Sequence, residues 1–164
     1  MKKTVGAVLL LLLLTSPLYA QEKSAGDTPD KSRAAATPEQ LETTFKAMLT
    51  KATMSGRWCS VKDGKLGPEK EEAYSIVSAN KVSGHKWMIH TRIKVNEKEM
   101  VVPVPVEVKW AGDTAVLSVD KLQYPPGGGT YSARILFYDH TYAGTWSGGD
   151  HGGLMSGVIT NEKD

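Results

Sequence analysis

Residues 85–119 read HKWMIHTRIKVNEKEMVVPVPVEVKWAGDTAVLSV, and within this segment apolar and polar side chains alternate. In 85–95 the apolar side chains stand at odd positions: Trp87, Ile89, Ile93 and Val95. In 99–110 they stand at even positions: Met100, Val102, Val104, Val106, Val108 and Trp110. A period of two predicts strands with one buried and one solvated face, as antiparallel sheets have.

The same alternation continues on both sides of this segment. It is clear in Ala115, Leu117 and Val119 and in Tyr131, Ala133, Ile135 and Phe137, and weaker at 54–62, 72–82, 141–147 and 153–160. The connections at 83–84, 96–97, 111–113 and 139–141 are too short for crossover helices, so consecutive strands should pair as hairpins. We therefore predict a mainly β fold, an antiparallel up-and-down meander of about eight strands that forms a small barrel. A two-sheet sandwich is the alternative.

Two prolines should interrupt the hydrogen bonding that closes this barrel. Pro103 and Pro105 are two residues apart in the longest predicted strand, so both positions without an N–H group face the same neighbouring strand. A continuous ladder on that side is not expected. The barrel should be split, bulged or loosely paired beside residues 101–107, and full pairing on both sides would refute this prediction.

One amphipathic helix precedes the strands. Thr37 is a suitable N-cap, Pro38 suits the first helical position, and Gln40 completes a capping box. Leu41, Phe45, Met48, Leu49 and Ala52 then recur at helical spacing. We predict a helix over 37–52 that packs one apolar stripe against the barrel.

The first residues have the pattern of a secretory signal peptide. Lys2 and Lys3 precede an apolar run that is too short to span a bilayer, and the stretch closes with Leu18-Tyr19-Ala20. We expect a Sec-type signal peptide over 1–20, a flexible polar leader over 21–36, and a single domain over 37–164. The mature protein should be periplasmic or extracellular, with no integral membrane segment.

Charge and cysteine content exclude several functions. The formal charge of +2 comes from Lys2 and Lys3, because 18 basic and 18 acidic residues follow from position 21 onward. A neutral mature chain has no basic footprint for nucleic acid. The single cysteine, Cys59, permits no intramolecular disulfide, and the four histidines fall at different places of the meander, so we expect no metal and no cofactor.

Two segments carry a resemblance to a known group of proteins. Gly56-Arg57-Trp58 resembles the G-x-W signature that opens lipocalin barrels, and residues 142–153, YAGTWSGGDHGG, resemble the closing hairpin of small lipocalin-like or avidin-like domains. The mature chain is similar to uncharacterised secreted bacterial proteins that end in a G-T-W-S-G-G-D-H-G-G segment. The resemblance implies a lipocalin-like (calycin-type) barrel and no particular activity. Lipocalins normally add a final helix and usually a disulfide, from which this chain departs.

The candidate ligand-binding residues are aromatic side chains of the predicted inner face and polar residues of the loops at one end of the meander. They are Trp87, Trp110, Tyr124, Phe137, Trp146, Asp150 and His151. The tryptophans could line a pocket for an apolar or aromatic-stacking ligand, or they could fill the barrel outright. Asp150 and His151 could supply a carboxylate and an imidazole, or form a turn with an exposed histidine.

Two function classes follow from these alternatives. The first is an exported protein that binds a small apolar or aromatic-stacking ligand, which predicts an internal pocket. The second is a structural or interaction module of the cell envelope, which predicts a filled core. An enzyme comes third and no catalytic residue is assigned, because the sequence has no G-x-S-x-G elbow, no H-E-x-x-H helix and no phosphate-binding glycine loop. The oligomeric state is left open.

Overall fold

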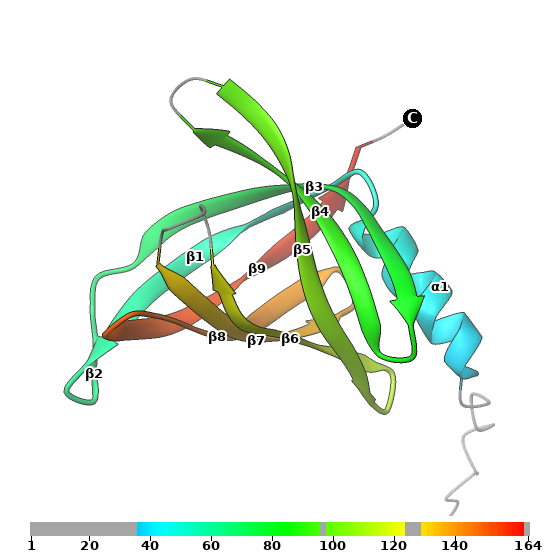
Figure 1. Ribbon diagram of the computed structural model, residues 1–164. Helices are drawn as coiled ribbons and strands as arrows, with labels where there is room; N and C mark the ends of the chain where they lie inside the picture. Colours follow the sequence, from blue (N-terminus) through cyan, green and yellow to red (C-terminus); the bar gives the residue numbers. More distant parts are fainter. Residues whose placement is uncertain (1–35, 96–97, 124–128, 163–164) are drawn as a thin grey trace, which may run out of the picture. The chain divides into compact units, whose positions relative to one another are not determined.

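The computed structural model describes residues 36–95, 98–123 and 129–162. Within these ranges the chain forms one helix and nine strands: α1 (Pro38–Leu49), β1 (Ala52–Lys62), β2 (Lys65–Leu66), β3 (Lys70–Ser83), β4 (Lys86–Val95), β5 (Lys98–Ala111), β6 (Thr114–Gln123), β7 (Thr130–Tyr138), β8 (Thr141–Gly148) and β9 (His151–Asn161). Eight strands close into a ring, because β1 pairs with both β3 and β9, while β2 forms a short hairpin on β1 (Figure 1). The antiparallel barrel predicted from the sequence is confirmed, and the sandwich alternative is wrong.

The inner face of the barrel consists of the alternating apolar positions. Trp87 and Ile89 of β4, Val106 and Val108 of β5, and Phe137 of β7 are all buried. Their neighbours in sequence point outward, as the pleat of a strand requires. Burial of this one face supplies most of the folding free energy, because the hydrophobic effect scales with the apolar area removed from water.

The helix begins where the sequence predicts and ends earlier. The Thr37 side chain accepts a hydrogen bond from the Gln40 N–H at 3.3 Å, and the Thr37 N–H donates to Gln40 Oε1 at 2.8 Å, so the capping box is confirmed. The prediction that the helix continues to Ala52 is wrong: Lys51 has a positive φ of 48°, and Ala52 already pairs within the sheet. The Asn161 side chain of β9 donates to carbonyl oxygens at the end of α1, which satisfies groups that have no partner inside a helix.

The two ends of the barrel differ. We call the end with the turns at 84–85, 112–113 and 139–140 the helix end, because α1 contacts β1, β3 and β9 and inserts Phe45 among residues of β4, β5 and β7 there. We call the opposite end, which carries the β1–β2 hairpin and the β8–β9 turn, the mouth. The successive antiparallel pairings place consecutive connections alternately at these two ends.

The ladder between β5 and β6 is short. β5 pairs with β4 over 98–107, but with β6 only over 107–111. The Val108 N–H donates to the backbone carbonyl oxygen of His85, the residue just before β4, so the backbone N–H and C=O groups of even positions in β5 point toward β4. Those of the odd positions, including Pro103 and Pro105, point toward the unpaired side. The predicted loose pairing beside the two prolines is confirmed. In Figure 1 the far end of the β4–β5 hairpin stands clear of β6 and β7.

Candidate ligand-binding cavity

The mouth half of the barrel contains a cavity of about 480 Å³ that is partly open to the surface. This volume falls within the range of roughly 300–1,000 Å³ that is usual for small-molecule sites. Its walls are mainly apolar, and Leu49 of α1 contributes to the wall at the helix end. The lining residues from the barrel strands include Met54, Ile76, Ile89, Val104, Val106, Leu117, Val119, Ala133, Ile135 and Met155. The barrel is therefore partly hollow.

The helix half of the barrel is filled by an aromatic cluster around Phe45. The Phe45 ring lies 5.3 Å from Trp87, 6.0 Å from Trp110 and 5.7 Å from Phe137, each in an edge-to-face arrangement. Such rings attract one another beyond the area that they bury. Two of the candidate ligand-binding residues, Trp87 and Trp110, pack against Phe45 and do not line the cavity. The sequence placed Phe45 on the apolar stripe of the helix, but the identity of its partners depends on the tertiary fold.

Phe137 and Trp146 are the candidate residues that do line the cavity. Trp146 lies edge-to-face with Trp58 of the G-x-W segment, with ring centroids 5.4 Å apart. The Trp146 Nε1 atom is buried without a hydrogen-bond partner among the described residues, and it would lie 2.9 Å from a Cβ atom added at Gly153. The missing side chain at Gly153 makes room for this indole.

The remaining candidates lie at or beyond the rim. Asp150 lies in the β8–β9 turn and His151 begins β9; Asp150 Oδ1 and His151 Nδ1 are 3.2 Å apart, and both side chains are exposed. The hydrogen bond with His151 holds the pKa of the Asp150 carboxyl below its usual range. The His151 ring packs edge-to-face on Trp146 at 5.4 Å, so it borders the cavity from outside. Tyr124 lies outside the described residues.

A polar cluster that the sequence analysis missed lies in the cavity wall. Glu72 of β3 accepts a hydrogen bond from the Tyr142 hydroxyl at 2.8 Å on one carboxylate oxygen and from the Tyr74 hydroxyl at 3.0 Å on the other. Glu72 and Tyr74 both line the cavity. The sequence does carry one sign of this cluster. Glu72 and Tyr74 stand at even positions of β3, like the buried Ile76, so alternation places all three on the inner face.

Two glycines allow Tyr142 to reach Glu72. The register places Tyr142 opposite Gly157, Gly157 opposite Gly56, and Gly56 opposite Glu72, so these four residues form one row across β8, β9, β1 and β3. A Cβ atom at Gly56 would lie 2.5 Å from the Tyr142 hydroxyl oxygen, and one at Gly157 would lie 2.7 Å from the Tyr142 ring. The tyrosine therefore lies flat over two positions where any other residue would block it.

The pKa values of both tyrosine hydroxyls in this cluster are raised above those of free tyrosines. Burial is the largest cause that raises the pKa of Tyr142 above its ordinary value, followed by the hydrogen bond to Glu72 and the Glu72 charge. Burial also raises the pKa of Tyr74, together with the same carboxylate. A phenolate beside a carboxylate in an apolar wall would place two like charges together, which both effects oppose.

One side of the cavity reaches the gap between β5 and β6. Thr91 and Val104 line it on the β4–β5 side, and Leu122 and Tyr131 line it on the β6–β7 side. The strands that border the gap are thus also walls of the cavity.

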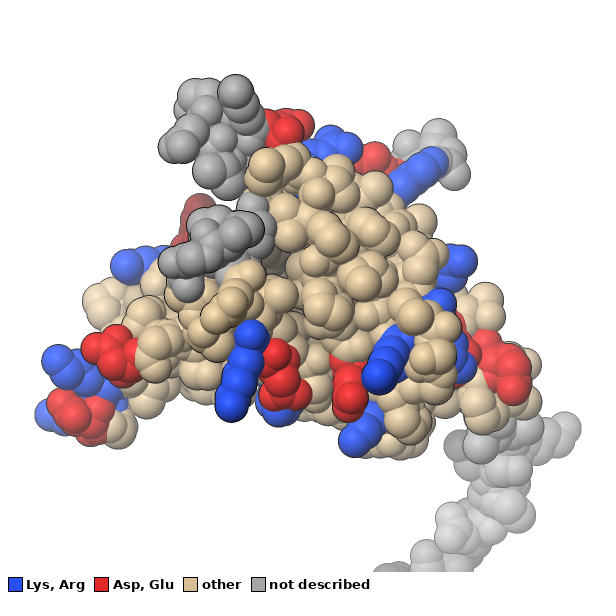
Figure 2. All heavy atoms as spheres, viewed as in Figure 1, with Lys and Arg blue, Asp and Glu red and all other residues tan. Residues whose placement is uncertain are grey.

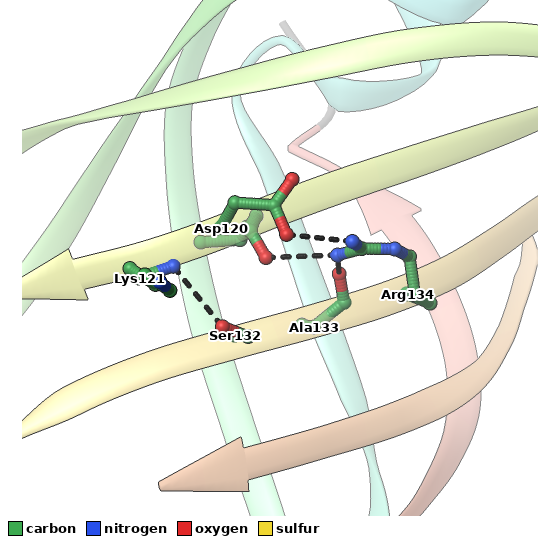
Figure 3. Close-up of polar contacts among 6 residues, drawn as sticks. Asp120, Lys121, Ser132, Ala133 and Arg134 are labelled. Atoms are coloured by element: carbon green, nitrogen blue, oxygen red, sulfur yellow. Dashed lines mark hydrogen bonds and ion pairs between the residues drawn. The ribbon is translucent and has the colours of Figure 1, made fainter.

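A bulge in β6 lies at the border of this gap (Figure 3). The β6–β7 register shifts between Val119 and Leu122. Arg134 of β7 donates to the Val119 carbonyl oxygen at 3.0 Å and to Asp120 Oδ1 at 2.6 Å, while the Ser132 hydroxyl accepts the Lys121 N–H at 3.0 Å. The bonds to the Val119 carbonyl oxygen and from the Lys121 N–H satisfy backbone groups that the bulge removes from the ladder.

The outer surface shows a mixed charge pattern. In the view of Figure 2, lysine and arginine side chains alternate with acidic ones along the lower edge of the barrel and form no single basic stripe. Among the described residues, no group of three or more His, Cys, Asp or Glu side chains is arranged to hold a metal ion. In the same part of the chain, no helix is both long enough and apolar enough to span a membrane.

Comparison of the chain with protein-family models, with curated proteins and with solved structures finds no match. The class of the protein is therefore defined by its own architecture. It is a closed eight-stranded antiparallel β-barrel, filled at one end by a helix and hollow at the other. The resemblance to lipocalin-like proteins stays a prediction.

Proposed function

We propose that this barrel binds a small, mainly apolar ligand in its mouth-side cavity. The observation that carries the proposal is the contrast between the two halves of one interior. Phe45 and its aromatic neighbours fill the helix half, whereas about 480 Å³ beside Trp58, Phe137 and Trp146 is hollow. Apolar walls favour an apolar guest, because binding removes apolar surface of both partners from water.

The structural or interaction module is the second function class considered, and it predicts a filled core. The cavity favours ligand binding over this alternative. A barrel with no internal ligand would be expected to pack the mouth half as tightly as the helix half, since interiors are close-packed.

Binding can be measured with N-phenylnaphthylamine, whose fluorescence rises in apolar surroundings, and with decanol as the displacing competitor. We expect saturable binding and full displacement. Ala133→Phe places a ring in the cavity and should weaken binding by about tenfold or more. Ala143→Phe, on the exposed outer face of β8, is the matched control and should bind as the wild type does. Equal binding by both variants, or no saturable binding by the wild type, would refute the proposal.

We also propose that the protein is exported and reaches the periplasm or the extracellular space. The support is the sequence pattern of residues 1–20, which lie outside the described ranges. Expression of the full chain in a bacterial host, followed by amino-terminal sequencing of the product outside the cytoplasm, tests this proposal. The expected mature product begins at Gln21, and an uncleaved product confined to the cytoplasm would contradict it.

A further inference from the structure

We propose that the cavity selects amphiphilic amines, that is, ligands with an apolar body and a cationic or N–H-donating head that binds Glu72. This inference rests on the proposed function, because it names the ligand class of the same cavity. Three independent features of the cavity wall support it: its charge, the direction of its hydrogen bonds, and its aromatic rings.

The charge of the wall is the first feature. Among the described residues that line the cavity, Glu72 is the one charged side chain, and the lining includes no lysine, arginine or histidine. Within the described part of the chain, Glu72 forms no ion pair with a basic group, and the carboxylates that pair with lysine or arginine are others, such as Glu42, Glu69 and Asp120. A half-buried carboxylate without a counter-ion favours a cationic head group and disfavours an anionic one.

The direction of the hydrogen bonds is the second feature. An ionised carboxylate only accepts hydrogen bonds, so the Tyr74 and Tyr142 hydroxyls must both donate to Glu72. The single proton of each hydroxyl is therefore already used in a hydrogen bond within the cluster. The cluster can offer a ligand only lone pairs, on the carboxylate and phenol oxygens. Its complement is a donor such as an ammonium group, and a ligand carboxylate would find no proton there.

The aromatic rings are the third feature. Trp58 lines the cavity near Glu72, because it stands two residues from Gly56, the register partner of Glu72. The ammonium group of Lys70, which is exposed, already lies over the Trp58 ring at 4.9 Å from the centroid. The protein's own structure thus shows that this ring accepts an ammonium group on its face. Because Lys70 already lies over Trp58, a ligand ammonium at Glu72 would have the carboxylate as its main partner, with the aromatic wall beside it.

The test compares three decyl compounds that differ only in the head group: decylamine, decanol and decanoate. Their affinities are measured at neutral pH by displacement of N-phenylnaphthylamine, below the concentrations at which they form micelles. We expect decylamine to bind about tenfold or more tightly than decanol, as a charge-assisted hydrogen bond provides, and decanoate to bind most weakly. The wild-type series alone is decisive even if a variant fails to fold.

Two variants locate the head group. Glu72→Gln keeps the size of the side chain and removes its charge, so it should abolish the preference for decylamine while decanol affinity changes by less than about threefold. Glu71→Gln removes the same charge from the exposed outer face of β3 and should behave as the wild type. Near-ultraviolet circular dichroism checks that both variants retain their packing.

The possible outcomes separate the two proposals. If decanol binds but decylamine binds no better, or if Glu72→Gln keeps the preference, the amine inference is overturned while the apolar binding function stands. If none of the three compounds displaces the probe because the wild type binds nothing, the proposed function itself fails and the amine inference fails with it.

Discussion

The hydroxyl of Tyr142 on β8 donates a hydrogen bond to Glu72 on β3 at 2.8 Å, although β9 and β1 lie between the two strands. The contact is possible because Gly157 and Gly56 occupy the intervening positions of the same row. This row joins the last strands of the chain to the first ones on the inner face of the barrel. It therefore contributes to closing the barrel and to shaping the polar part of the cavity wall.

Gly157→Ala should destabilise the fold strongly. The added Cβ would lie 2.7 Å from the Tyr142 ring and would also clash with the Ser55 carbonyl oxygen, so both the ring and the backbone must shift. We expect a loss of about 2–3 kcal/mol in the free energy of unfolding, measured with urea. Gly67→Ala is the control, because its Cβ would meet chiefly the movable Ser60 hydroxyl. Equal stability of the two variants would show that the row is not a tight contact.

Alkaline pH should destabilise the protein through the two tyrosines. Tyrosines of the unfolded chain ionise near pH 10, whereas the pKa values of Tyr74 and Tyr142 are raised in the folded state. The stability due to this difference is complete below about pH 10 and declines as pH rises further. Urea unfolding as a function of pH should show a shallower alkaline decline for Tyr142→Phe. Tyr138→Phe, which removes a hydroxyl from a 53% exposed side chain, is the control. A wild-type slope in Tyr142→Phe would contradict this account.

The two prolines of β5 should keep its open edge from pairing with other chains. Pro103 and Pro105 face the gap and offer no N–H group there. The double variant Pro103→Thr, Pro105→Thr restores two donors without adding apolar surface, so we expect self-association. Size-exclusion chromatography with light scattering measures it. Val101→Thr is the control, because it alters a side chain of the same edge without changing the backbone N–H groups. An unchanged mass for the proline variant would contradict this prediction.

Arg134 should contribute more than Asp120 to the stability of the bulge in β6. Arg134 donates to the Val119 carbonyl oxygen as well as to the Asp120 carboxylate, so Arg134→Gln loses bonds that Asp120→Asn leaves in place. We expect about 1 kcal/mol of destabilisation for the first variant and less than about half of that for the second, because the ion pair itself is exposed. Urea denaturation gives both values. A larger effect of Asp120→Asn would mean that the ion pair, not the backbone contact, matters.

Phe45→Ala should be the most damaging change in the helix. The ring is 1% exposed and contacts three other aromatic residues, so its removal leaves a cavity at the helix end. Loss of about 3–5 kcal/mol is expected from thermal or urea unfolding. The exposed Thr44→Ala should change stability by less than about 0.5 kcal/mol. Similar stabilities of the two variants would refute the view that Phe45 fills this end of the barrel.

Local patterns in the sequence predicted most of the backbone. Alternating side chains predicted the strands, short connections predicted the hairpins, and the capping box of Thr37 predicted where the helix begins. The end of the helix was predicted too late, because Ala52 continues the helical spacing but pairs with Ile76 of β3 instead. A residue that suits either element is assigned by its tertiary partners, and those partners lie far along the chain.

The candidate site was predicted less well than the fold. The parity of Phe137 and Trp146 correctly indicated inward side chains, and both line the cavity. Alternation within their strands also placed Trp87 and Trp110 on the inner face. Only their contacts with Phe45 show that they belong to the filled end of the barrel. Glu72 was read as part of a weak strand, because a single carboxylate gives no sign of which hydroxyls will reach it.

The sequence by itself determined the class of fold and its loosely paired seam, because alternation, turn length and the missing N–H groups of Pro103 and Pro105 act through the chain's own local chemistry. Only the tertiary structure decided which part of the interior is filled and which is hollow. It also decided that Glu72 meets Tyr142. Both depend on the register between strands that are distant in sequence, and register is set by the packing of the whole barrel rather than by any one segment.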